Sequence, residues 1–428
     1  MKQGRRVGGE PTLARADWWK IGIAMFAIGF GANHFAPLLP VYRQELDLSQ
    51  SKVTFLLAIY ILGLIPALLA GGALSDRYGR RAVMRPATII SLAGTLLLMA
   101  LPDKFEIIVA LGRLVTGVAV GLMLSAGASW LKEVTALSGG TTEVGARRAT
   151  IATSAGFGLG PACSGALAQW APAPLYTPLV VHVVLIVLSA FLVWRVPEAT
   201  VAPNTQSPVS QSASSQTPVS QSPDTDRGHG WSVRAIMPIA PTLFWAPWVF
   251  GTATTAFATL NTFALDEVSV PIAFTGLMAT TAMGSGVAVQ PLATRAISRS
   301  GRPPARVGLL LAAAGMLLGT FLVWTHSPAL ALVAAVVLGS AYGTLMVSGL
   351  FTVQRAAHHD DLGRLTAVYY SFTYLGFFAP FVISVLSKVA PQQYVMMFGM
   401  VVALLTALAT ALAGLSPRRA RRPRRRLR

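Results

Sequence analysis

The stretch GALSDRYGRR at residues 72–81 ends a long apolar run and carries much of the information about the fold. Gly72 allows two helices to approach closely, and Gly79 allows a tight turn. Asp76 stands among arginines, where its carboxylate can form an ion pair or cap the N-terminus of a neighbouring helix. A charged contact that forms in one conformation and breaks in another acts as a gate. The predicted gating residues are Gly72, Asp76, Arg77, Gly79, Arg80 and Arg81.

The apolar run before this stretch is one of twelve along the chain. Of the 428 residues, 54% are hydrophobic and only 12% are charged, whereas soluble proteins carry about 25% charged residues. A helix of about 20 apolar residues spans a bilayer and pairs its own backbone groups, which lipid cannot do. We therefore expect an all-α membrane protein with twelve transmembrane helices. The predicted spans are 19–41, 54–74, 84–101, 107–131, 149–171, 177–196, 236–263, 272–297, 307–324, 329–353, 365–386 and 394–415.

The basic residues are distributed unevenly between the loops on the two sides of these spans. With the N-terminus inside, only Arg43, Lys52, Lys104 and Lys388 fall in outer loops, and Arg113 lies within a span. The other lysines and arginines lie on the inner side, which is the usual bias of membrane proteins. We expect a multi-pass protein of the cell membrane with both termini in the cytoplasm.

Two polar segments divide the chain. Residues 197–234 include QSPVSQSASSQTPVSQSP, a composition that cannot bury enough apolar surface to fold. The C-terminal SPRRARRPRRRLR is an arginine cluster that suits the anionic inner leaflet of the membrane better than nucleic acid. The predicted organisation is an N-terminal cytoplasmic tail (1–18), a first six-helix bundle (19–196), a disordered cytoplasmic linker (197–234), a second six-helix bundle (235–415) and a polybasic cytoplasmic tail (416–428).

The two predicted bundles resemble each other in sequence. The matches, in chain order, are Arg77-Tyr78-Gly79-Arg80 with Arg299-Ser300-Gly301-Arg302, Gly117 with Gly339, Gly121 with Gly343, and Gly160-Pro161 with Ala379-Pro380. Each pair falls on the equivalent helix or loop of its bundle. Duplicated, pseudo-symmetric halves are common in secondary transporters, whose substrate site lies near the midplane between them.

Three motifs resemble those of the major facilitator superfamily. Residues 72–81 match its signature loop, G-x-L-[AS]-D-R-x-G-R-[RK], at every defining position. Arg113 and Gly117 resemble the R-x-x-x-G motif of the fourth helix. Residues 156–165 (GFGLGPACSG) resemble the antiporter motif G-x-x-x-G-P-x-x-G-G, with Ser164 at the first of the two final glycines. The resemblance implies the major facilitator fold and favours the drug:proton antiporter branch. The helix-interface residues that it implies are Gly117, Gly156, Gly160, Pro161 and Gly165.

No acid lies within a predicted span, although many drug-exporting relatives carry one in the first helix. The titratable candidates that remain are histidines, which exchange protons in the physiological range. His34 lies at about the depth of Arg113, and the first and fourth helices line one cavity in the superfamily. We expect Asn33, His34 and Arg113 to form a polar patch for substrate binding or proton coupling. The alternatives are that His34 is a packing residue and that Arg113 extends to the outer surface. His182, nearer the edge of its span, is expected to be a packing residue.

Aromatic and polar residues of the second half are candidates for the cavity wall, because aromatic rings with a few polar groups suit a mostly apolar ligand. They are Trp245, Trp248, Asn261, Gln290, Tyr342 and Tyr374. His358-His359-Asp360-Asp361 is more typical of solvated charge than of a metal site, and we expect no metal and no other cofactor. The sequence contains no G-x-x-x-x-G-K-[ST] loop for ATP and no catalytic constellation, so we expect a transporter rather than an enzyme.

These features predict a monomeric secondary active transporter that works by alternating access. Its predicted task is proton-driven efflux of a small apolar or amphipathic drug or metabolite, and its predicted partners are that compound, protons and a bilayer with an anionic inner leaflet. One alternative is a proton-coupled importer of a sugar or an organic acid, which the antiporter-like motif disfavours. The other is a non-transporting receptor or partner of envelope synthesis, in which Asp76→Asn would leave the activity intact.

Overall fold

The computed structural model describes residues 17–45, 47–99, 106–196, 236–357 and 362–415. Within these ranges every regular element is a helix, and ten helical stretches are long and apolar enough to cross a membrane. Two further helical segments, at 142–170 and 237–263, complete the twelve expected from the sequence. The predicted linker, the polybasic tail and residues 1–16 lie outside the described residues.

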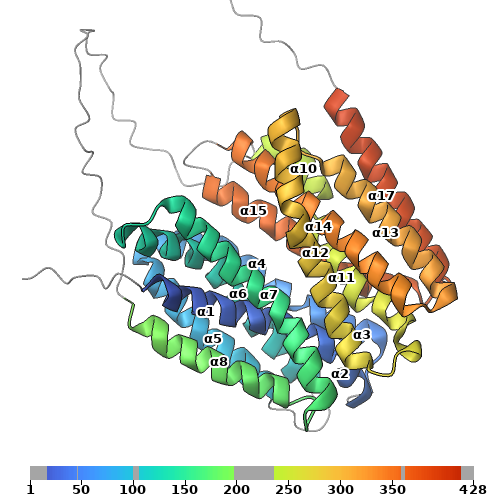
Figure 1. Cartoon of the computed structure of the whole chain (residues 1–428), viewed down its shortest axis with the longest axis horizontal. Coiled ribbons are helices and arrows are strands. Elements are labelled where there is room, and N and C mark those ends of the chain that lie inside the picture. Colours follow the sequence, from blue (N-terminus) through green and yellow to red (C-terminus); the bar gives the residue numbers. More distant parts are fainter. Residues whose placement is uncertain (1–16, 46, 100–105, 197–235, 358–361, 416–428) are drawn as a thin grey trace, which may run out of the picture.

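The first half of the chain forms the elements α1 to α8 (Figure 1). They are α1 Trp18–Asn33, the 3-10 helix η1 Ala36–Leu38, α2 Leu39–Glu45, α3 Gln50–Ala58, α4 Tyr60–Tyr78, α5 Arg80–Met99, α6 Glu106–Leu137, α7 Thr142–Trp170 and α8 Thr177–Trp194. The predicted first span is α1 with α2, and the second is α3 with α4. The fourth and fifth spans are longer than expected because α6 and α7 continue past the apolar core.

The second half forms the elements from η2 to α17. They are η2 Met237–Ile239, α10 Ala240–Trp245, α11 Trp248–Ala258, η3 Leu260–Phe263, η4 Leu265–Glu267, α12 Pro271–Ser300, α13 Ala305–Thr325, α14 Pro328–Ala356, α15 Leu362–Tyr374, η5 Leu375–Phe378, α16 Ala379–Leu386 and α17 Gln392–Leu415. The seventh predicted span comprises the elements from η2 to η3, and the eleventh comprises α15, η5 and α16. The other four predicted spans are one helix each, and η4 lies between the seventh and the eighth.

Four of the spans are interrupted along their length. Pro37 follows the end of α1 and Pro247 separates α10 from α11; a proline has no N–H to continue a helical ladder. The second span is interrupted at Ile59, between α3 and α4, and the eleventh is interrupted by η5, between α15 and α16. Interruptions leave backbone carbonyl oxygens without helical donors inside an apolar bundle, so side chains have to supply the missing hydrogen bonds.

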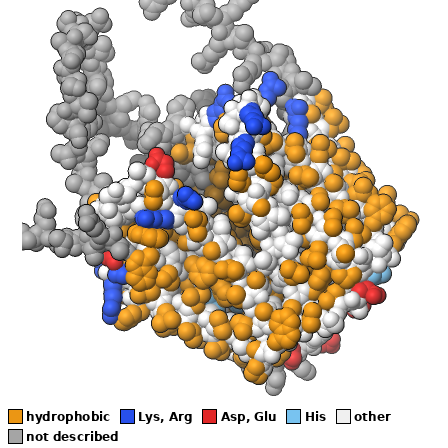
Figure 2. All heavy atoms as spheres, viewed as in Figure 1, with side chains coloured by type: hydrophobic (Ala, Val, Ile, Leu, Met, Phe, Trp, Pro, Cys, Tyr) orange, Lys and Arg blue, Asp and Glu red, His pale blue; other side chains and the backbone are white. Residues whose placement is uncertain are grey.

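The helices alternate in direction, so their junctions collect at two ends of the molecule. We define the basic end by the junctions at 78–80, 137–142, 300–305 and 356–362. It carries the arginines between residues 77 and 85, at 147 and 148, and between 295 and 306. Figure 2 shows a group of Lys and Arg side chains gathered toward the top of the view. We define the acidic end by the junctions at 45–50, 263–271 and 386–392, which carry Asp47, Asp266 and Glu267.

The two halves meet at the acidic end, and their helices spread apart toward the basic end (Figure 1). Gln50 Nε2 of α3 donates to the carbonyl oxygen of Ala258 at 3.2 Å, and Ser384 Oγ of α16 donates to Ser51 Oγ at 2.7 Å. Two N–H groups in the first turn of α12 donate to Gln169 Oε1 of α7, at 3.0 and 3.3 Å. A small set of polar contacts thus joins the halves at the acidic end.

Glycines at equivalent positions bring the same pair of helices together in each half. A Cβ at Gly117 of α6 would overlap the backbone of α4, and a Cβ at Gly339 of α14 would overlap the backbone of α12. Small residues at helix crossings allow this close approach in membranes. The structure therefore gives a shared physical role to two glycines that the internal repeat aligns.

Gly117→Ala and Gly339→Ala should each destabilise the protein, because the added methyl group has to push two helix backbones apart. We expect a loss of about 1–3 kcal/mol in the free energy of unfolding, measured as a lowered Tm of the purified protein in detergent. Gly158→Ala and Gly284→Ala are matched controls, since a Cβ at either position meets no atom within 4 Å. Equal Tm values for all four variants would contradict the close packing.

Candidate functional site

Arg113 of α6 is completely buried inside the first half. Its guanidinium donates to the carbonyl oxygens of Ala32 at 3.3 Å, Leu56 at 3.4 Å and Leu57 at 3.4 Å. These oxygens belong to the last turns of α1 and α3, where the helices end and carbonyls lack helical donors. Helix C-termini carry partial negative charge, so the two that converge here stabilise the positive charge of Arg113. Arg113 is held within the bundle and does not extend to the outer surface.

Aromatic rings rather than a carboxylate complete the surroundings of Arg113. The guanidinium carbon lies 4.4 Å from the ring centroid of Phe35 and 4.7 Å from that of Tyr60. The ion pairs between described residues all involve other cations. A cation over a desolvated ring is stabilised by about 2 kcal/mol. The site therefore holds a net positive charge that only dipoles and ring faces offset.

His34 and Asn33 lie beside Arg113 in the chain fold but make contacts of their own. His34 is fully buried, neither ring nitrogen has a hydrogen-bond partner, and its ring stacks on that of His182 with centroids 5.1 Å apart. Asn33 Nδ2 donates to the carbonyl oxygen of Phe157 in α7 at 3.3 Å. Arg113 contacts the flanking residues instead, so the three expected members of the patch are neighbours without a direct bond.

An aromatic cluster extends from Arg113 into the second half. The Tyr60 ring, on which Arg113 lies, packs edge-on against Phe377 at 5.1 Å. Phe250 stacks on Tyr374 at 4.5 Å and lies 5.1 Å from Phe377. The cluster, completed by Tyr342 at 5.3 Å from Phe250, connects the halves at mid-depth. We call Tyr60, Phe250, Tyr342, Tyr374 and Phe377 the aromatic cluster.

The predicted gating loop binds together three helices of the first half. Asp76 Oδ1 of α4 pairs with Arg80 of α5 at 2.5 Å, and Arg80 Nε pairs with Glu133 Oε1 of α6 at 3.2 Å. Partial burial acts to lower the pKa of Arg80, but the hydrogen bonds to both carboxylates outweigh it and raise that pKa above its usual value. Gly79 ends α4 with a φ of 92°, in the left-handed region that favours glycine.

One expectation for this loop differs from the structure. A Cβ at Gly72 would meet no atom within 4 Å, so Gly72 makes no close helix contact in this conformation. The Asp76 side chain is 69% exposed, which places the loop at an open surface. Arg77 lies 5.2 Å from the Tyr78 ring. Arg81 belongs to the first turn of α5.

The sequence matches a family model described as the Major Facilitator Superfamily over residues 21–380, with a second match over residues 243–427. The chain belongs to the Major Facilitator Superfamily. It is a multi-pass membrane protein of the transporter type. Among curated protein sequences, none matches it.

Solved transporter structures share this Major Facilitator Superfamily fold. A mutant of the nucleoside transporter NupG superposes with a TM-score of 0.72 at 11% identity, over 93% of this chain and 99% of that one. A mutant of the peptide transporter POT bound to alafosfalin gives 0.71 at 13%, over 93% and 94%. The xylose transporter XylE from E. coli gives 0.61 at 16%, over 94% and 97%. Identities this low show the fold alone, and the drug:proton antiporter branch stays a prediction.

The motif of residues 156–165 places α7 of this superfamily member between the halves. A Cβ at Gly156 or Gly160 would strike the backbone of α1. A Cβ at Gly165 would lie 3.0 Å from Gly276 Cα in α12, and a Cβ at Gly276 would lie 2.7 Å from the Pro161 carbonyl oxygen. These small residues let α7 pack tightly against one helix of each half.

The cavity residues expected in the second half have different locations. Tyr342 and Tyr374 belong to the aromatic cluster. Trp245 is 4% exposed in α10, and Trp248 packs against the core of the second half. Gln290 is partly exposed in the part of α12 nearer the basic end. Tyr60, Phe250 and Phe377 were not expected from the sequence, because only their contacts distinguish them from other buried aromatics.

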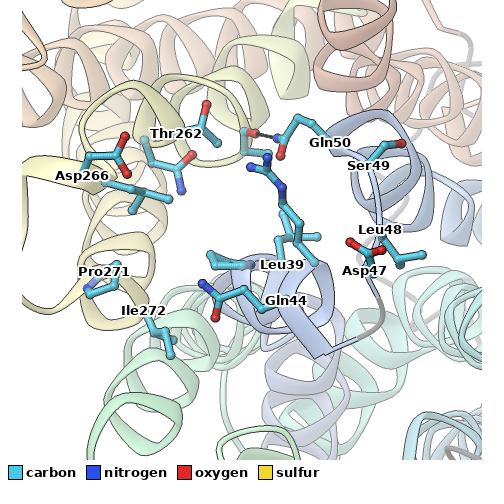
Figure 3. Close-up of a pocket in the computed structure, with 15 residues that line it drawn as sticks. Leu39, Gln44, Asp47, Leu48, Ser49, Gln50, Thr262, Asp266, Pro271 and Ile272 are labelled. Carbon is cyan, nitrogen blue, oxygen red and sulfur yellow. Dashed lines mark hydrogen bonds between the residues drawn. The ribbon is translucent and has the colours of Figure 1, made fainter. Parts of the chain in front are cut away.

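Asn261 lines a separate pocket at the acidic end (Figure 3), with a volume of about 780 Å³. Arg43, Asp47 and Asp266 also line it, and Figure 3 shows Asp47 and Asp266 on opposite sides. Asn261 Nδ2 donates to Thr275 Oγ1 at 3.1 Å, while its buried Oδ1 has no partner. Asn261 thus lies in a polar vestibule instead of beside Tyr342 and Tyr374.

Among the described residues, no three His, Cys, Asp or Glu side chains are grouped so that they could hold a metal ion. The segment 358–361, with its two histidines and two aspartates, lies outside the described part of the chain.

Proposed function

We propose that this chain exports a small apolar or amphipathic compound in exchange for protons, by alternating access. The observation that carries the proposal is the aromatic cluster between the halves beside one buried cation, Arg113. Ring faces bind apolar parts of a ligand, and a single charged group orients its polar part. A site of this composition suits an amphipathic compound better than a sugar, which needs many hydrogen-bond donors and acceptors.

The arrangement of the two ends indicates which step of the transport cycle this conformation represents. If the basic end faces the cytoplasm, as the positive-inside bias predicts, the acidic end with its interhalf contacts is the closed outer side. The gating loop then lies exposed at the inner side, ready to close when the outer side opens. A compound would be loaded from the cytoplasm or the inner leaflet in this conformation. The similar structure of XylE is of a partially occluded inward open conformation.

A second candidate function is the uptake of an organic acid or a sugar. Arg113 favours it to the extent that a buried cation without a carboxylate partner suits an anionic ligand. The similar structures are of nucleoside, peptide and xylose transporters. Uptake and export predict opposite responses in the same assay.

The test uses everted membrane vesicles with an acidified lumen and a pH-sensitive dye. We expect a lipophilic compound from a panel of neutral and anionic drugs, such as chloramphenicol and nalidixic acid, to release protons from the lumen, because the buried cation would repel a cationic compound. Asp76→Asn should abolish this release, because the gating loop loses the carboxylate that binds Arg80. The Tm should change little, since a largely exposed ion pair contributes about 0–1 kcal/mol.

Two matched variants separate binding from gating. Tyr374→Ala should lose the response to the lipophilic compound, whereas Tyr374→Phe should keep it because the stacked ring remains. Proton movement with sugars or organic acids, and none with the lipophilic panel, would move the assignment to uptake. A response that survives Asp76→Asn unchanged would contradict the gate and favour a non-transporting role.

A further inference from the structure

His182 of α8 occupies a site built from three helices of the first half. Its ring is fully buried; Nδ1 lies 2.7 Å from Thr95 Oγ1 of α5, and Nε2 lies 3.1 Å from the carbonyl oxygen of Ala27 in α1. Gly31 leaves the space for the ring, because a Cβ there would overlap it. Any buried histidine needs hydrogen-bond partners, but here one partner is a hydroxyl, which can either donate or accept.

The hydrogen bonds around His182 can be completed in either protonation state. The Ala27 oxygen only accepts, so Nε2 carries a hydrogen in both states. In the neutral state the Thr95 hydroxyl donates to Nδ1. When Nδ1 gains a proton it donates to Thr95 Oγ1, and the hydroxyl hydrogen turns to the carbonyl oxygen of Ser91, which lies 3.2 Å away. One hydroxyl rotation thus spares the site an unpaired buried donor.

The surroundings of the His34–His182 pair favour binding of a single proton, and they favour binding it on His182. His34 stacks on His182, but its two buried ring nitrogens make no hydrogen bond of normal geometry, whereas both ring nitrogens of His182 have a partner, so His182 holds a proton better. Arg113 hydrogen-bonds to the carbonyl oxygen of Ala32, two residues before His34, so its positive charge also lies near this histidine pair. A second cation beside a protonated His182 would add like-charge repulsion.

The other described charges of the helices packed against α8 lie far along those helices. The charged residue of α1 is Lys20, which lies in the first turn of that helix. It is seven residues, or about 10 Å along the helix, from Ala27. In α5 and α7 they belong to the first two turns at the basic end; they are Arg80, Arg81, Arg85, Glu143, Arg147 and Arg148. No described carboxylate faces the histidine pair, so nothing fixes the proton on His182 permanently.

We propose that His182, with Thr95 as its hydrogen-bond partner, is the residue that binds and releases the proton exchanged for substrate. The proposal rests on the proton exchange put forward above. On uptake, a proton from water forms an N–H bond at Nδ1; on release that bond breaks and the proton returns to water on the other side of the membrane. His34 stays neutral and limits the pair to one proton.

A contact chain connects this proton to the interface between the halves. A positive His182 acts on His34, which follows the last residue of α1, and the His34 carbonyl oxygen accepts a hydrogen bond from Ser164 Oγ of α7 at 2.6 Å. The next residue, Gly165, packs against Gly276 of α12 in the second half. A change in the charge of His182 can therefore alter the position of the α7 segment that packs against the second half.

Substitutions can imitate single protonation states of the site. His182→Gln retains an amide that can donate to Ala27 O and an oxygen that can accept from Thr95, but it cannot gain a proton. In the vesicle assay it should lose substrate-induced proton release, while exchange of external for internal radiolabelled chloramphenicol without a pH gradient continues. Thr95→Val should lose proton release and Thr95→Ser should keep it. His326→Gln should keep it, because His326 is exposed at the acidic end, where its Nδ1 hydrogen-bonds to the Phe263 carbonyl oxygen at 2.7 Å.

A measurement without any transported compound tests the same assignment. Nitrogen NMR of the full-length protein, labelled with ¹⁵N-histidine in lipid nanodiscs and titrated from about pH 8 to 4.5, should show that His182 gains its second proton before His34 does. Protonation of His34 first would overturn the proposal, as would undiminished proton release by His182→Gln. If wild-type vesicles release no protons with any compound while the His182 signal titrates as expected, the proposed export function fails and the proton site stands.

Discussion

A disulfide between Ser51→Cys and Ser384→Cys should abolish transport, and a reducing agent should restore it. The two hydroxyl oxygens lie 2.7 Å apart and join α3 of one half to α16 of the other. Sulfur atoms at these positions come within reach of the bond length of about 2.05 Å that a disulfide needs. Because alternating access requires the acidic end to open, a covalent bond across it holds the protein in the conformation described above.

The experiment needs a background without the native thiol. Cys163 is the sole cysteine of the chain and is exposed, so Cys163→Ala comes first. Transport is measured in vesicles before and after oxidation with copper phenanthroline, and again after dithiothreitol. Each single cysteine variant serves as a control and should respond to neither reagent. Full activity of the cross-linked protein would show that the acidic end does not open during transport.

Arg113→Met should abolish transport and also weaken the fold. The methionine fills a similar volume but leaves the carbonyl oxygens of Ala32, Leu56 and Leu57 without their donor. Unpaired buried acceptors cost about 1–3 kcal/mol, so the Tm in detergent should fall. The aromatic cluster would also lose the charge that lies over Tyr60.

Arg113→Lys separates charge from geometry. It keeps the cation, but an ammonium group cannot reproduce the planar fork that reaches three oxygens and two ring faces. We expect part of the stability to return and transport to remain impaired. Arg43→Met, in the vestibule at the acidic end, is the matched control for loss of a cation and should keep the wild-type Tm. Normal transport by Arg113→Met would remove the buried cation from the mechanism.

The fold could be predicted because its signals are local. A run of apolar residues is visible wherever it stands, and residues 72–81 mark where one run ends. The apolar runs do not reveal where the helices are interrupted. The interruption at Ile59 has no proline to mark it, and its structural role becomes visible only in the hydrogen bonds from Arg113 to the carbonyl oxygens of Leu56 and Leu57. The lengths of α6 and α7 beyond the apolar core were missed for a related reason, since their ends are polar and still helical.

The site depends on contacts between helices, and those were predicted less well. Arg113 was recognisable as an unusual charge within a span, but its partners are backbone atoms that carry no sequence signal. Glu133, which pairs with Arg80, is an ordinary acid near the end of a helix until α5 and α6 are placed together. The sequence placed His182 among packing residues because its partners, Thr95 and Ala27, lie 87 and 155 residues away.

The use of main-chain oxygens around Arg113 has a consequence for mutational tolerance. A carboxylate partner can be lost through a change in its own codon, and the loss can be repaired by a charge elsewhere. The oxygens of Ala32, Leu56 and Leu57 are present whatever side chains those codons specify. Side chains around the cation can therefore drift, and alter which compounds fit, without disturbing the hydrogen bonds that hold it. The genetic vulnerability of the charge is concentrated in the single codon for Arg113.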